Sequence, residues 1–204
     1  MTPGDMDRRV VVLVVPAKGT WAPPGRDPEQ WRLAMAEDSY EVLAALDLVD
    51  VAVAVVGGDQ VAVAEVAGLT WPGTPVFAVG TPFEAVRKVG PATSVVLVSH
   101  DVPDLPGLLV GKLFRALSPA DASVCPASDG SLVALGVHVP PADWLAELAP
   151  SLDTPLAELD AAKPRRLAIG LGPGWHRLRS VADIGVLDPG LEGWEATRAL
   201  LSGR

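Results

Sequence analysis

The sequence has little of what several classes of protein require. It contains one cysteine, Cys125, so an intramolecular disulfide and a cysteine-rich zinc site are both excluded. No apolar run reaches the length of about 18 residues that a membrane-spanning helix needs. Basic residues are also scarce, because 16 lysines and arginines stand against 25 acids and the net charge is −9. With no long basic cluster to follow a phosphate backbone, nucleic-acid binding is disfavoured.

The residues that are abundant describe a folded, loop-rich protein. Hydrophobic residues make up 49% of the chain, which is ample for one buried core. The length of 204 residues predicts a single domain that covers residues 1–204. Arg8 and Arg9 precede an apolar run that is too short for a signal-peptide core, so we expect a cytoplasmic protein.

Short β-branched runs alternate with segments of helical periodicity. Val10–Val15 is typical of a strand buried on both faces. Asp27, Pro28 and Gln30 form a helix start, and apolar residues at helical spacing carry that helix to about Leu46. Further strands are predicted at Val51–Val56, Pro75–Val79, Ser94–Ser99, Ala122–Cys125, Leu132–Val139 and Arg166–Ile169. Further helices are predicted at Gln60–Ala67, Phe83–Val89, Pro106–Leu117, Ala142–Leu148, Pro155–Ala162 and in the C-terminal tail.

This alternation predicts the fold class. Strands that alternate with helices pair in parallel, which gives an α/β fold of three layers with a mostly parallel sheet. The two β runs on either side of Ser128–Ser131 lie close together along the chain, so we expect them to add antiparallel strands to that sheet. Ligands bind such sheets at the carboxyl ends of the strands, where loops meet helix N-termini.

Two loops at that edge carry candidate binding residues. Lys18 and Gly19 follow the first strand, where glycine allows close backbone approach and the lysine is a point charge for a phosphate. The alternative is an ordinary loop with a solvated lysine. Asp101 and Asp104 follow another buried strand, and carboxylate oxygens in this position suit Mg²⁺ or Mn²⁺. The alternative is that Asp101 only ends the strand and Asp104 caps the next helix, with His100 a loop histidine rather than a ligand.

Three other features have both a structural and a functional interpretation. Asp129 and Gly130 have the residue types of a hairpin turn, and this structural role is favoured. Asp38 lies on the apolar stripe of its helix, where a carboxylate must be hydrogen-bonded, so anchoring a backbone segment is favoured over facing a ligand. Arg177 and Arg179 form a basic patch that is either a solvated face or an anion site.

Four segments of the chain resemble motifs of one bacterial transferase family. The strand and loop SVVLVSHDVPDLP is similar to an apolar strand that ends in S-D-C-P-D-L, and Pro126–Gly136 is similar to P-x-x-D-G-G-Y-Y-L-I-G. Val10–Lys18 resembles an opening strand with A-K, and Arg32–Leu46 resembles a first helix with an Asp at the place of Asp38. The family is that of GT-A-like transferases described as glycosyltransferases of unknown substrate, and 2-phospho-L-lactate guanylyltransferase is more distantly similar. The resemblance implies the Rossmann-like nucleotide-diphospho-sugar transferase fold of GT-A type.

The resemblance also implies substrates and site residues. A nucleotide or nucleotide sugar would be the donor, a small molecule the acceptor, and Mg²⁺ or Mn²⁺ the cation that assists transfer. Carried over by position, Asp101 is the metal ligand and, together with Asp104, a residue implied in catalysis. The residues implied in binding are Lys18 and Gly19 at the nucleotide phosphates, and Asp129 and Gly130 on the acceptor side.

The chain departs from the family at two places. Relatives follow A-K with a basic stretch resembling G-R-V-K-T-R-L, whereas the matching segment Gly19–Gln30 has Arg26 as its only cation. Relatives also carry a late D-V-D-T-P-E-D-L, whose first acids help to hold the metal. The matching segment of this chain is Arg177–Ile184, which has arginines in place of those acids. Arg26, Arg177 or Arg179 would then neutralise the phosphates, as fixed positive charge does elsewhere.

Three classes of function stay open. The first is a metal-assisted transferase that moves a glycosyl or nucleotidyl group from a nucleotide donor to a small acceptor. The second is a catalytically degenerate member, a pseudoenzyme, that binds a nucleotide or a protein partner without turnover; a homodimer is also possible. The third is an interaction module, which would need exposed tryptophans in the Pro/Gly-rich loops. The tryptophans concerned are Trp21, Trp71, Trp175 and Trp194.

Overall fold

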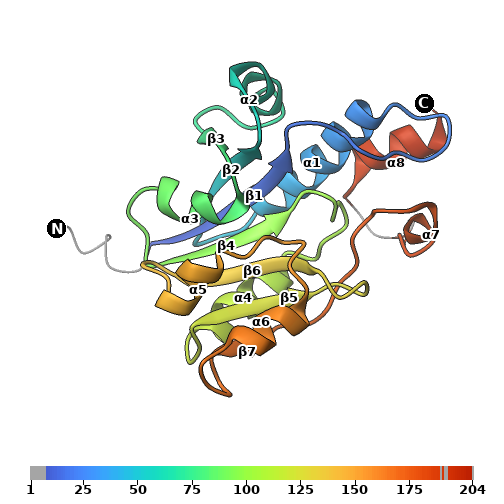
Figure 1. Cartoon of the computed structure of the whole chain (residues 1–204). Coiled ribbons are helices and arrows are strands. Elements are labelled where there is room, and N and C mark those ends of the chain that lie inside the picture. Colours follow the sequence, from blue (N-terminus) through green and yellow to red (C-terminus); the bar gives the residue numbers. More distant parts are fainter. Residues whose placement is uncertain (1–7, 189, 191–192, 204) are drawn as a thin grey trace.

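The computed structural model describes residues 8–188, 190 and 193–203, and within them seven strands form one sheet between helices (Figure 1). The strands are β1 (Arg9–Pro16), β2 (Asp50–Val56), β3 (Val76–Val79), β4 (Ser94–Ser99), β5 (Ala122–Pro126), β6 (Leu132–His138) and β7 (Ile169–Leu171). The helices are α1 (Pro28–Ala44), α2 (Gln60–Ala67), α3 (Ala85–Lys88), α4 (Leu108–Leu117), α5 (Asp143–Leu148), α6 (Leu156–Ala162), α7 (Val181–Ile184) and α8 (Glu195–Ser202). A 3₁₀ turn, Pro82–Glu84, precedes α3. In this described part, no helix is long and apolar enough to cross a membrane.

The sheet has the strand order β3-β2-β1-β4-β6-β5-β7. The first four of these strands are parallel, β6 runs antiparallel to β4 and β5, and β7 is parallel to β5. The predicted α/β fold with a mostly parallel sheet is therefore confirmed, and so is the antiparallel addition. β1 lies between β2 and β4, and its β-branched run is buried on both faces because helices cover both sides of the sheet.

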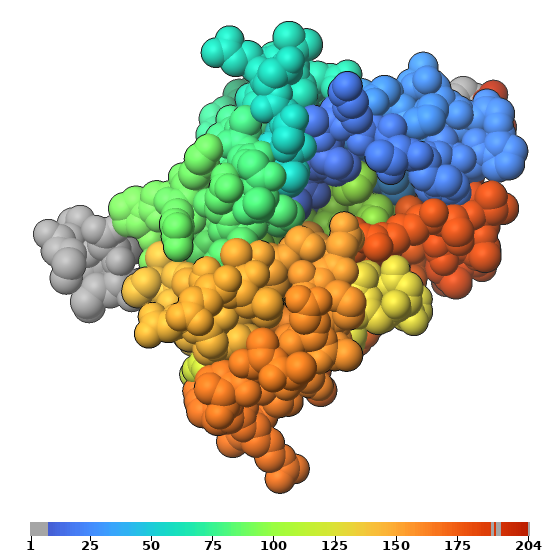
Figure 2. Space-filling model, viewed as in Figure 1, coloured from blue at the N-terminus to red at the C-terminus, as the bar shows by residue number. Residues whose placement is uncertain are grey.

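Each face of the sheet packs against its own apolar cluster. Val11 and Leu13 of β1 belong to the cluster with α1, α2 and α4, whereas Val10 and Val12 belong to the cluster with α3, α5 and α6. This alternation follows from the period of two in a strand. The segments that carry α3, α5 and α6 cover the face seen in Figure 2. The result is the predicted three-layer arrangement.

The start of α1 forms as its sequence predicts. Asp27 Oδ1 accepts hydrogen bonds of 3.0 Å from the backbone nitrogens of Glu29 and Gln30, and Pro28 occupies the first turn. The helix ends at Ala44, slightly before the predicted end at Leu46.

The C-terminal part of the chain folds back onto α1 and forms a third apolar cluster. This cluster consists of Trp31 and Met35 from α1 together with Leu178, Leu187 and Trp194. Figure 1 shows α8 lying beside α1. We call residues 177–188 and 193–203 the C-terminal clasp.

Asp38 joins α1 to the clasp. Its Oδ1 accepts a hydrogen bond of 3.0 Å from the nitrogen of Ala196, and its Oδ2 accepts one of 2.7 Å from the nitrogen of Thr197. Both nitrogens belong to the first turn of α8, which has no side-chain cap of its own. The prediction that Asp38 anchors a backbone segment is confirmed.

The tryptophans do not share an exposed surface. Trp194 is buried in the clasp, Trp21 packs edge-on against Trp31, and Trp175 is half-buried against the apolar cluster beneath α4. Of the four loop tryptophans, only Trp71 is exposed. The interaction-module hypothesis therefore loses the observation on which it depended.

The last strand lies slightly later than predicted. The sequence predicts a strand at Arg166–Ile169, but the residues that pair with β5 are Ile169–Leu171. Gly170 sits so close to α4 that a Cβ atom there would lie 2.3 Å from the carbonyl oxygen of Ala116. Gly170 has the residue type of a loop, but it is required here because a larger side chain would prevent the edge strand β7 from packing against α4.

Candidate functional site

The loops after β1 and β4 meet at one edge of the sheet and border a cleft. The two strands are parallel neighbours, so their carboxyl ends lie together. The cleft has a volume of about 440 Å³. Its walls come from the loop after β1, the first part of α1, the loop after β4, the loop between α5 and α6, and the start of the C-terminal clasp.

A second cavity, of about 480 Å³, lies near the start of β2. Its cations bind the chain itself, because Arg8 donates to Asp50 and to two carbonyls and Lys88 donates to the carbonyl of Ala78. It is far from the strand ends where ligands bind α/β sheets. We therefore take the cleft after β1 and β4 as the candidate site.

Asp101 lies at the floor of the cleft between two arginines. Its Oδ1 accepts a hydrogen bond of 2.8 Å from Arg177 Nε, and its Oδ2 accepts one of 3.2 Å from Arg179 Nε. Burial by itself would raise the pKa of this carboxyl group, but the charge of the Arg177 guanidinium, together with hydrogen bonds from Arg177 and Ser99, outweighs burial and lowers the pKa to about 2. Asp101 is therefore ionised and already compensated by the protein.

Arg177 is held rigidly below the cleft. The side chain is buried, and each of its three nitrogens donates hydrogen bonds. The acceptors are Asp101 Oδ1, Ser99 Oγ, Ser131 Oγ, Leu132 O, Leu152 O and Asp153 Oδ1. A guanidinium with this many partners is a fixed positive charge.

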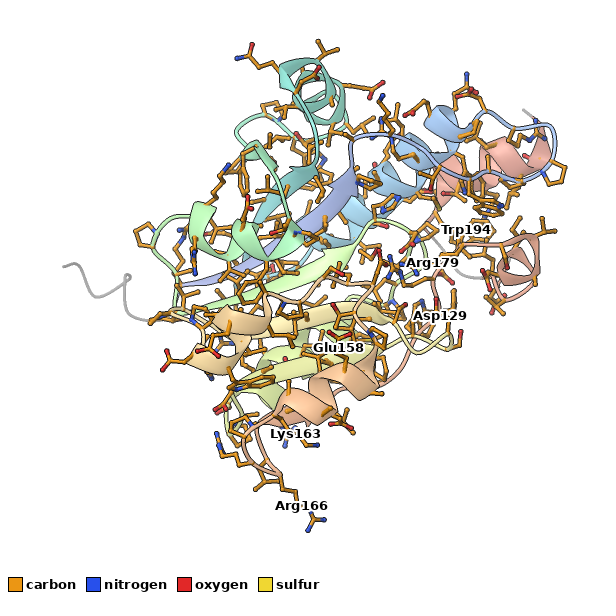
Figure 3. All side chains as sticks on the ribbon, viewed as in Figure 1. Asp129, Glu158, Lys163, Arg166, Arg179 and Trp194 are labelled. Atoms are coloured by element: carbon orange, nitrogen blue, oxygen red, sulfur yellow. The ribbon has the colours of Figure 1, made fainter. Side chains whose placement is uncertain are left out.

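Arg179 lies at the rim and is about one-third exposed, with a side-chain exposure of 34%. It contacts three acids: Asp101, Asp153, and Asp129 at 3.5 Å. Figure 3 shows Arg179 close to Asp129 at this edge of the sheet. Burial acts to lower the pKa of Arg179, but Asp101 and Asp153 outweigh it and raise that pKa. Arg179 is thus a cation that shares the cleft with two of its partners, Asp101 and Asp153.

The charges around Asp101 do not fit a divalent cation. Carboxylate oxygens are the ligands that Mg²⁺ and Mn²⁺ prefer, but both oxygens of Asp101 accept hydrogen bonds from guanidinium groups. The described residues contain no group of three His, Cys, Asp or Glu side chains that could hold a metal. A metal ion bound to Asp101 would lie next to two positive charges, so Asp101 as a metal ligand stays a prediction that this arrangement disfavours.

Asp153 also belongs to the site and is not among the candidate residues predicted from the sequence. Its Oδ1 accepts a hydrogen bond of 3.0 Å from Arg177 and another from Arg179. The signal was present in the sequence, because Asp153-Thr154-Pro155 repeats the D-T-P of the late family motif D-V-D-T-P-E-D-L. That motif was matched above to Arg177–Ile184, and the structure brings both segments to the site.

Lys18 is a cation of the cleft with no ion pair among the described residues. It is exposed, whereas the neighbouring Gly19 packs so closely on α1 that a Cβ would lie 2.1 Å from the carbonyl oxygen of Pro28. The nitrogen of Gly19 donates to Glu29 Oε1 at 2.8 Å. Arg32 is buried and also binds Glu29, at 2.8 Å. Glu29 thus already accepts hydrogen bonds from Gly19 and Arg32 beside Lys18. The ammonium group of Lys18 is exposed and has no such partner among the described residues.

Four candidate residues do not line the cleft, although Asp129 contacts Arg179 at its rim. Asp104 is buried outside the cleft and accepts hydrogen bonds from His176, at 2.9 Å, and from Trp175. The expectation that Asp104 caps α4 is wrong, because α4 has no side-chain cap. Arg26 does not line the cleft and lies against the end of α8. Gly130 forms the predicted turn with a φ of +85°, and Asp129 binds Ser131 within that turn.

His100, which the sequence predicts to be a loop histidine, also belongs to the site. Its imidazole borders the cleft, and its ring nitrogens have no hydrogen-bond partner among the described residues. Its carbonyl oxygen is held by the Ser39 hydroxyl at 2.9 Å. Burial lowers the pKa of the imidazole to about 4, so the ring is neutral at pH 7.

Comparisons with known proteins identify the fold. No protein-family model matches the chain, and no match is found among curated proteins. Among solved structures, the chain is similar to a proposed nucleotide-diphospho-sugar transferase from Desulfovibrio desulfuricans, with a TM-score of 0.72 and 21% identity over 97% of this chain and 96% of that one. It is also similar to Rv0371c of Mycobacterium tuberculosis in complex with manganese, with a TM-score of 0.59 and 19% identity over 90% of this chain and 100% of that one.

A third solved structure is CMP:2-keto-3-deoxy-manno-octonic acid synthetase complexed with CTP, with a TM-score of 0.56 and 14% identity over 97% of this chain and 99% of that one. The chain has the nucleotide-diphospho-sugar transferase fold, as the resemblance of its motifs implied. At these identities the similarity establishes the fold alone.

Proposed function

We propose that this chain, with its nucleotide-diphospho-sugar transferase fold, binds a nucleotide or nucleotide sugar in the cleft and transfers a glycosyl or nucleotidyl group from it to a small acceptor. The observation that carries the proposal is the pair of arginines on Asp101, with the exposed Lys18 at the same cleft. Similar folds include a synthetase complexed with CTP, which supports a nucleotide as the ligand.

The two arginines divide the work of charge neutralisation. Arg177 is buried and fixed, so it supplies a constant positive charge below the phosphates. Arg179 is partly exposed and exchanges the carboxylate of Asp153 for a phosphate oxygen when the nucleotide binds. In the transfer step, a bond forms to the acceptor oxygen while the bond to the departing phosphate breaks, and negative charge builds up on that phosphate. Preorganised cations stabilise this charge.

This proposal makes binding independent of added metal. The manganese complex of a similar structure supports metal binding in proteins of this fold. In this chain, however, guanidinium groups occupy both oxygens of Asp101. We therefore assign the neutralising role to Arg177, Arg179 and Lys18 and expect nucleotides to bind equally well in the presence of a chelator.

A second candidate function is nucleotide binding without turnover. It is favoured by the same two ion pairs of Asp101, because a carboxylate held by two arginines, with its pKa lowered to about 2, is a weak base. The two candidates predict the same binding and differ only in product formation.

A thermal-shift screen of nucleoside triphosphates, nucleoside diphosphates and nucleotide sugars tests the proposal. Each ligand is added with Mg²⁺, with Mn²⁺ and with EDTA. A ligand present at 100 times its Kd adds about 2.7 kcal/mol to the stability, which is readily seen for a chain of this length. We expect stabilisation that EDTA leaves unchanged. Stabilisation that requires the metal contradicts the assigned role of the arginines, and no response to any nucleotide contradicts nucleotide binding altogether.

Phosphorus NMR then separates the two candidates. The nucleotide that stabilises the chain is incubated with a set of small hydroxyl-bearing acceptors, and the phosphorus signals are followed over hours. Release of a nucleoside diphosphate or of pyrophosphate supports the transferase, and an unchanged spectrum supports binding without turnover.

A further inference from the structure

The cleft has a smaller second lobe on the other side of His100. This lobe has a volume of about 140 Å³. It shares Pro16, His100, Asp153 and Arg177 with the main cleft, so the two are adjoining spaces. The remaining wall is mostly apolar, with side chains from β1, β2, the 3₁₀ turn before α3 and the loop before α6. These side chains are Val14, Val56, Pro82 and Leu152.

Two of the polar side chains that line this lobe have atoms without a hydrogen-bond partner among the described residues. Arg177 already donates from all three nitrogens, and one of its acceptors is the hydroxyl of Ser99. Asp153 accepts both arginines on Oδ1, whereas its Oδ2 has no hydrogen-bond partner among the described residues, and its side chain is 70% exposed. The ring of His100 is likewise unpartnered within the described part of the chain. The lobe therefore presents a carboxylate oxygen and an imidazole.

We propose that this lobe binds a neutral, hydroxyl-bearing group, held by the imidazole of His100 and Oδ2 of Asp153. The inference rests on the proposed function, because the group is either the sugar of a nucleotide-sugar donor or a separate polyol acceptor. His100 is then a residue that determines specificity at the boundary between the nucleotide and this group.

The chemistry of the walls selects this class of ligand. A carboxylate oxygen accepts hydrogen bonds and an imidazole both donates and accepts them, which matches the hydroxyl groups of a sugar or polyol. A second phosphate or a carboxylate would face Asp153 across a short distance, and like charges at such a distance repel. The apolar side chains pack against carbon, and the volume is roughly that of five liquid waters, so only a small group fits.

Side-chain ¹⁵N NMR of the histidines tests the proposal on the full chain. The sequence has three histidines, and two of them are internal controls. His138 lies at the far end of β6 and binds the carbonyls of Leu117 and Ala120, and His176 is bound to Asp104. The probes, all in EDTA, are UDP, UDP-glucose, UDP with glycerol, UDP with glycerate, and glycerol alone at high concentration. GDP and GDP-mannose form a second series with another base.

We expect the ring resonances of His100 to move further with a neutral hydroxyl probe than with UDP, while those of His138 and His176 stay in place. A response to UDP-glucose assigns the lobe to the sugar of the donor, and a response to UDP with glycerol assigns it to a separate acceptor. Unmoved resonances with all the neutral probes overturn the proposal. An equal response to glycerate overturns the preference for a neutral group.

The same experiment separates this inference from the proposed function. Failure of every nucleotide in the thermal-shift screen contradicts nucleotide binding, and a response of His100 to glycerol alone then still supports the lobe. Nucleotide binding without any response of His100 to the neutral probes leaves the proposed function standing and overturns the lobe.

Two variants of His100 add a quantitative measure. The ratio of the affinities for UDP-glucose and UDP should fall about tenfold in His100→Leu, as expected for a lost hydrogen bond, and should fall less in His100→Gln, which retains an amide. His138→Gln is the matched control and should leave the ratio unchanged. If a separate acceptor, rather than the donor's sugar, occupies the lobe, His100→Leu should instead lower the apparent affinity for glycerol, measured in the presence of UDP, by about tenfold. An unchanged value for both probes in His100→Leu contradicts the assigned role of His100.

Discussion

Asp101 is buried between two guanidinium groups, and its charge compensates that of Arg177. Substitution by Asn keeps the shape but removes the negative charge, so Arg177 remains buried with less compensation. Breaking a buried ion pair in this way costs about 3 kcal/mol. We expect Asp101→Asn to lower the free energy of unfolding by about that amount in urea denaturation. Asp47→Asn, at an exposed position, is the control, and an equally small effect of both variants would contradict the buried pair.

The acid stability of the protein should depend on the same carboxyl group. The pKa of Asp101 is about 2 in the folded chain, below the value of about 3.9 in an unfolded chain. The group therefore contributes stability above pH 4, and this contribution is lost as the pH falls from about 4 towards 2. Urea denaturation of the wild type and Asp101→Asn between pH 6 and pH 2 measures it. The difference between them should shrink towards pH 2; a constant difference would mean that Asp101 is not the group responsible.

The exposed cations of the cleft should control nucleotide affinity. Arg179→Gln and Lys18→Gln each remove one charge-assisted hydrogen bond to a phosphate, so we expect each to weaken binding about tenfold, measured by calorimetry in EDTA. Lys112→Gln removes an exposed lysine of α4 and serves as the charge-matched control. If all three variants bind equally, the nucleotide does not lie at this cleft.

The site residues differ in how far the sequence could reveal them. Asp101 was found because it directly follows a buried strand, which is a local signal. Its partner Arg177 lies 76 residues away, so the sequence left open whether that arginine faces solvent or an anion. Asp153 carried the D-T-P signal of the family motif, yet only the pairing of chain segments in three dimensions shows that it meets Arg177 and Arg179.

Helix α8 depends on a carboxylate that belongs to another helix. Asp38 accepts the first backbone N–H groups of α8, so Asp38→Ala leaves one buried donor, Thr197 N, and one partly buried donor, Ala196 N, without this partner. Loss of such a cap costs about 1 to 2 kcal/mol. We expect amide hydrogen exchange to accelerate about tenfold or more in α8, with little change in α4 as the internal reference. Equal acceleration in both helices would point to global destabilisation instead.

The elements themselves were predictable where the signal is local. Asp27, Pro28 and Gln30 predict the start of α1, and the expected cap forms there. β7 lies later than predicted, because its ends are set by pairing with β5 and by contact with α4. Both partners are distant in sequence, so a short stretch of residues around β7 does not contain this information.

Viewed as one molecule, the protein has a net charge of −9 but gathers Lys18, Arg177 and Arg179 at one cleft. The overall field repels an anionic ligand, so the local cations must provide both attraction and orientation. The strand–helix alternation predicts the layered sheet, because hydrophobic periodicity is a property of neighbouring residues. The balance of charge at the site depends on residues that are far apart in sequence, such as Asp101 and Arg177. For that reason it follows only from the fold.

The separation between Asp101 and Arg177 also has a consequence for the order in which the chain is made. Translation proceeds from the N-terminus, so Asp101 emerges 76 residues before the arginine that compensates it. At ribosomal rates of roughly 5 to 20 residues per second, this interval lasts about 4 to 15 s. During this interval the ribosome has already made the four parallel strands, β1 to β4, but it has not yet made the arginines of the clasp that compensate Asp101. The centre of the sheet is therefore synthesised before its charge is balanced.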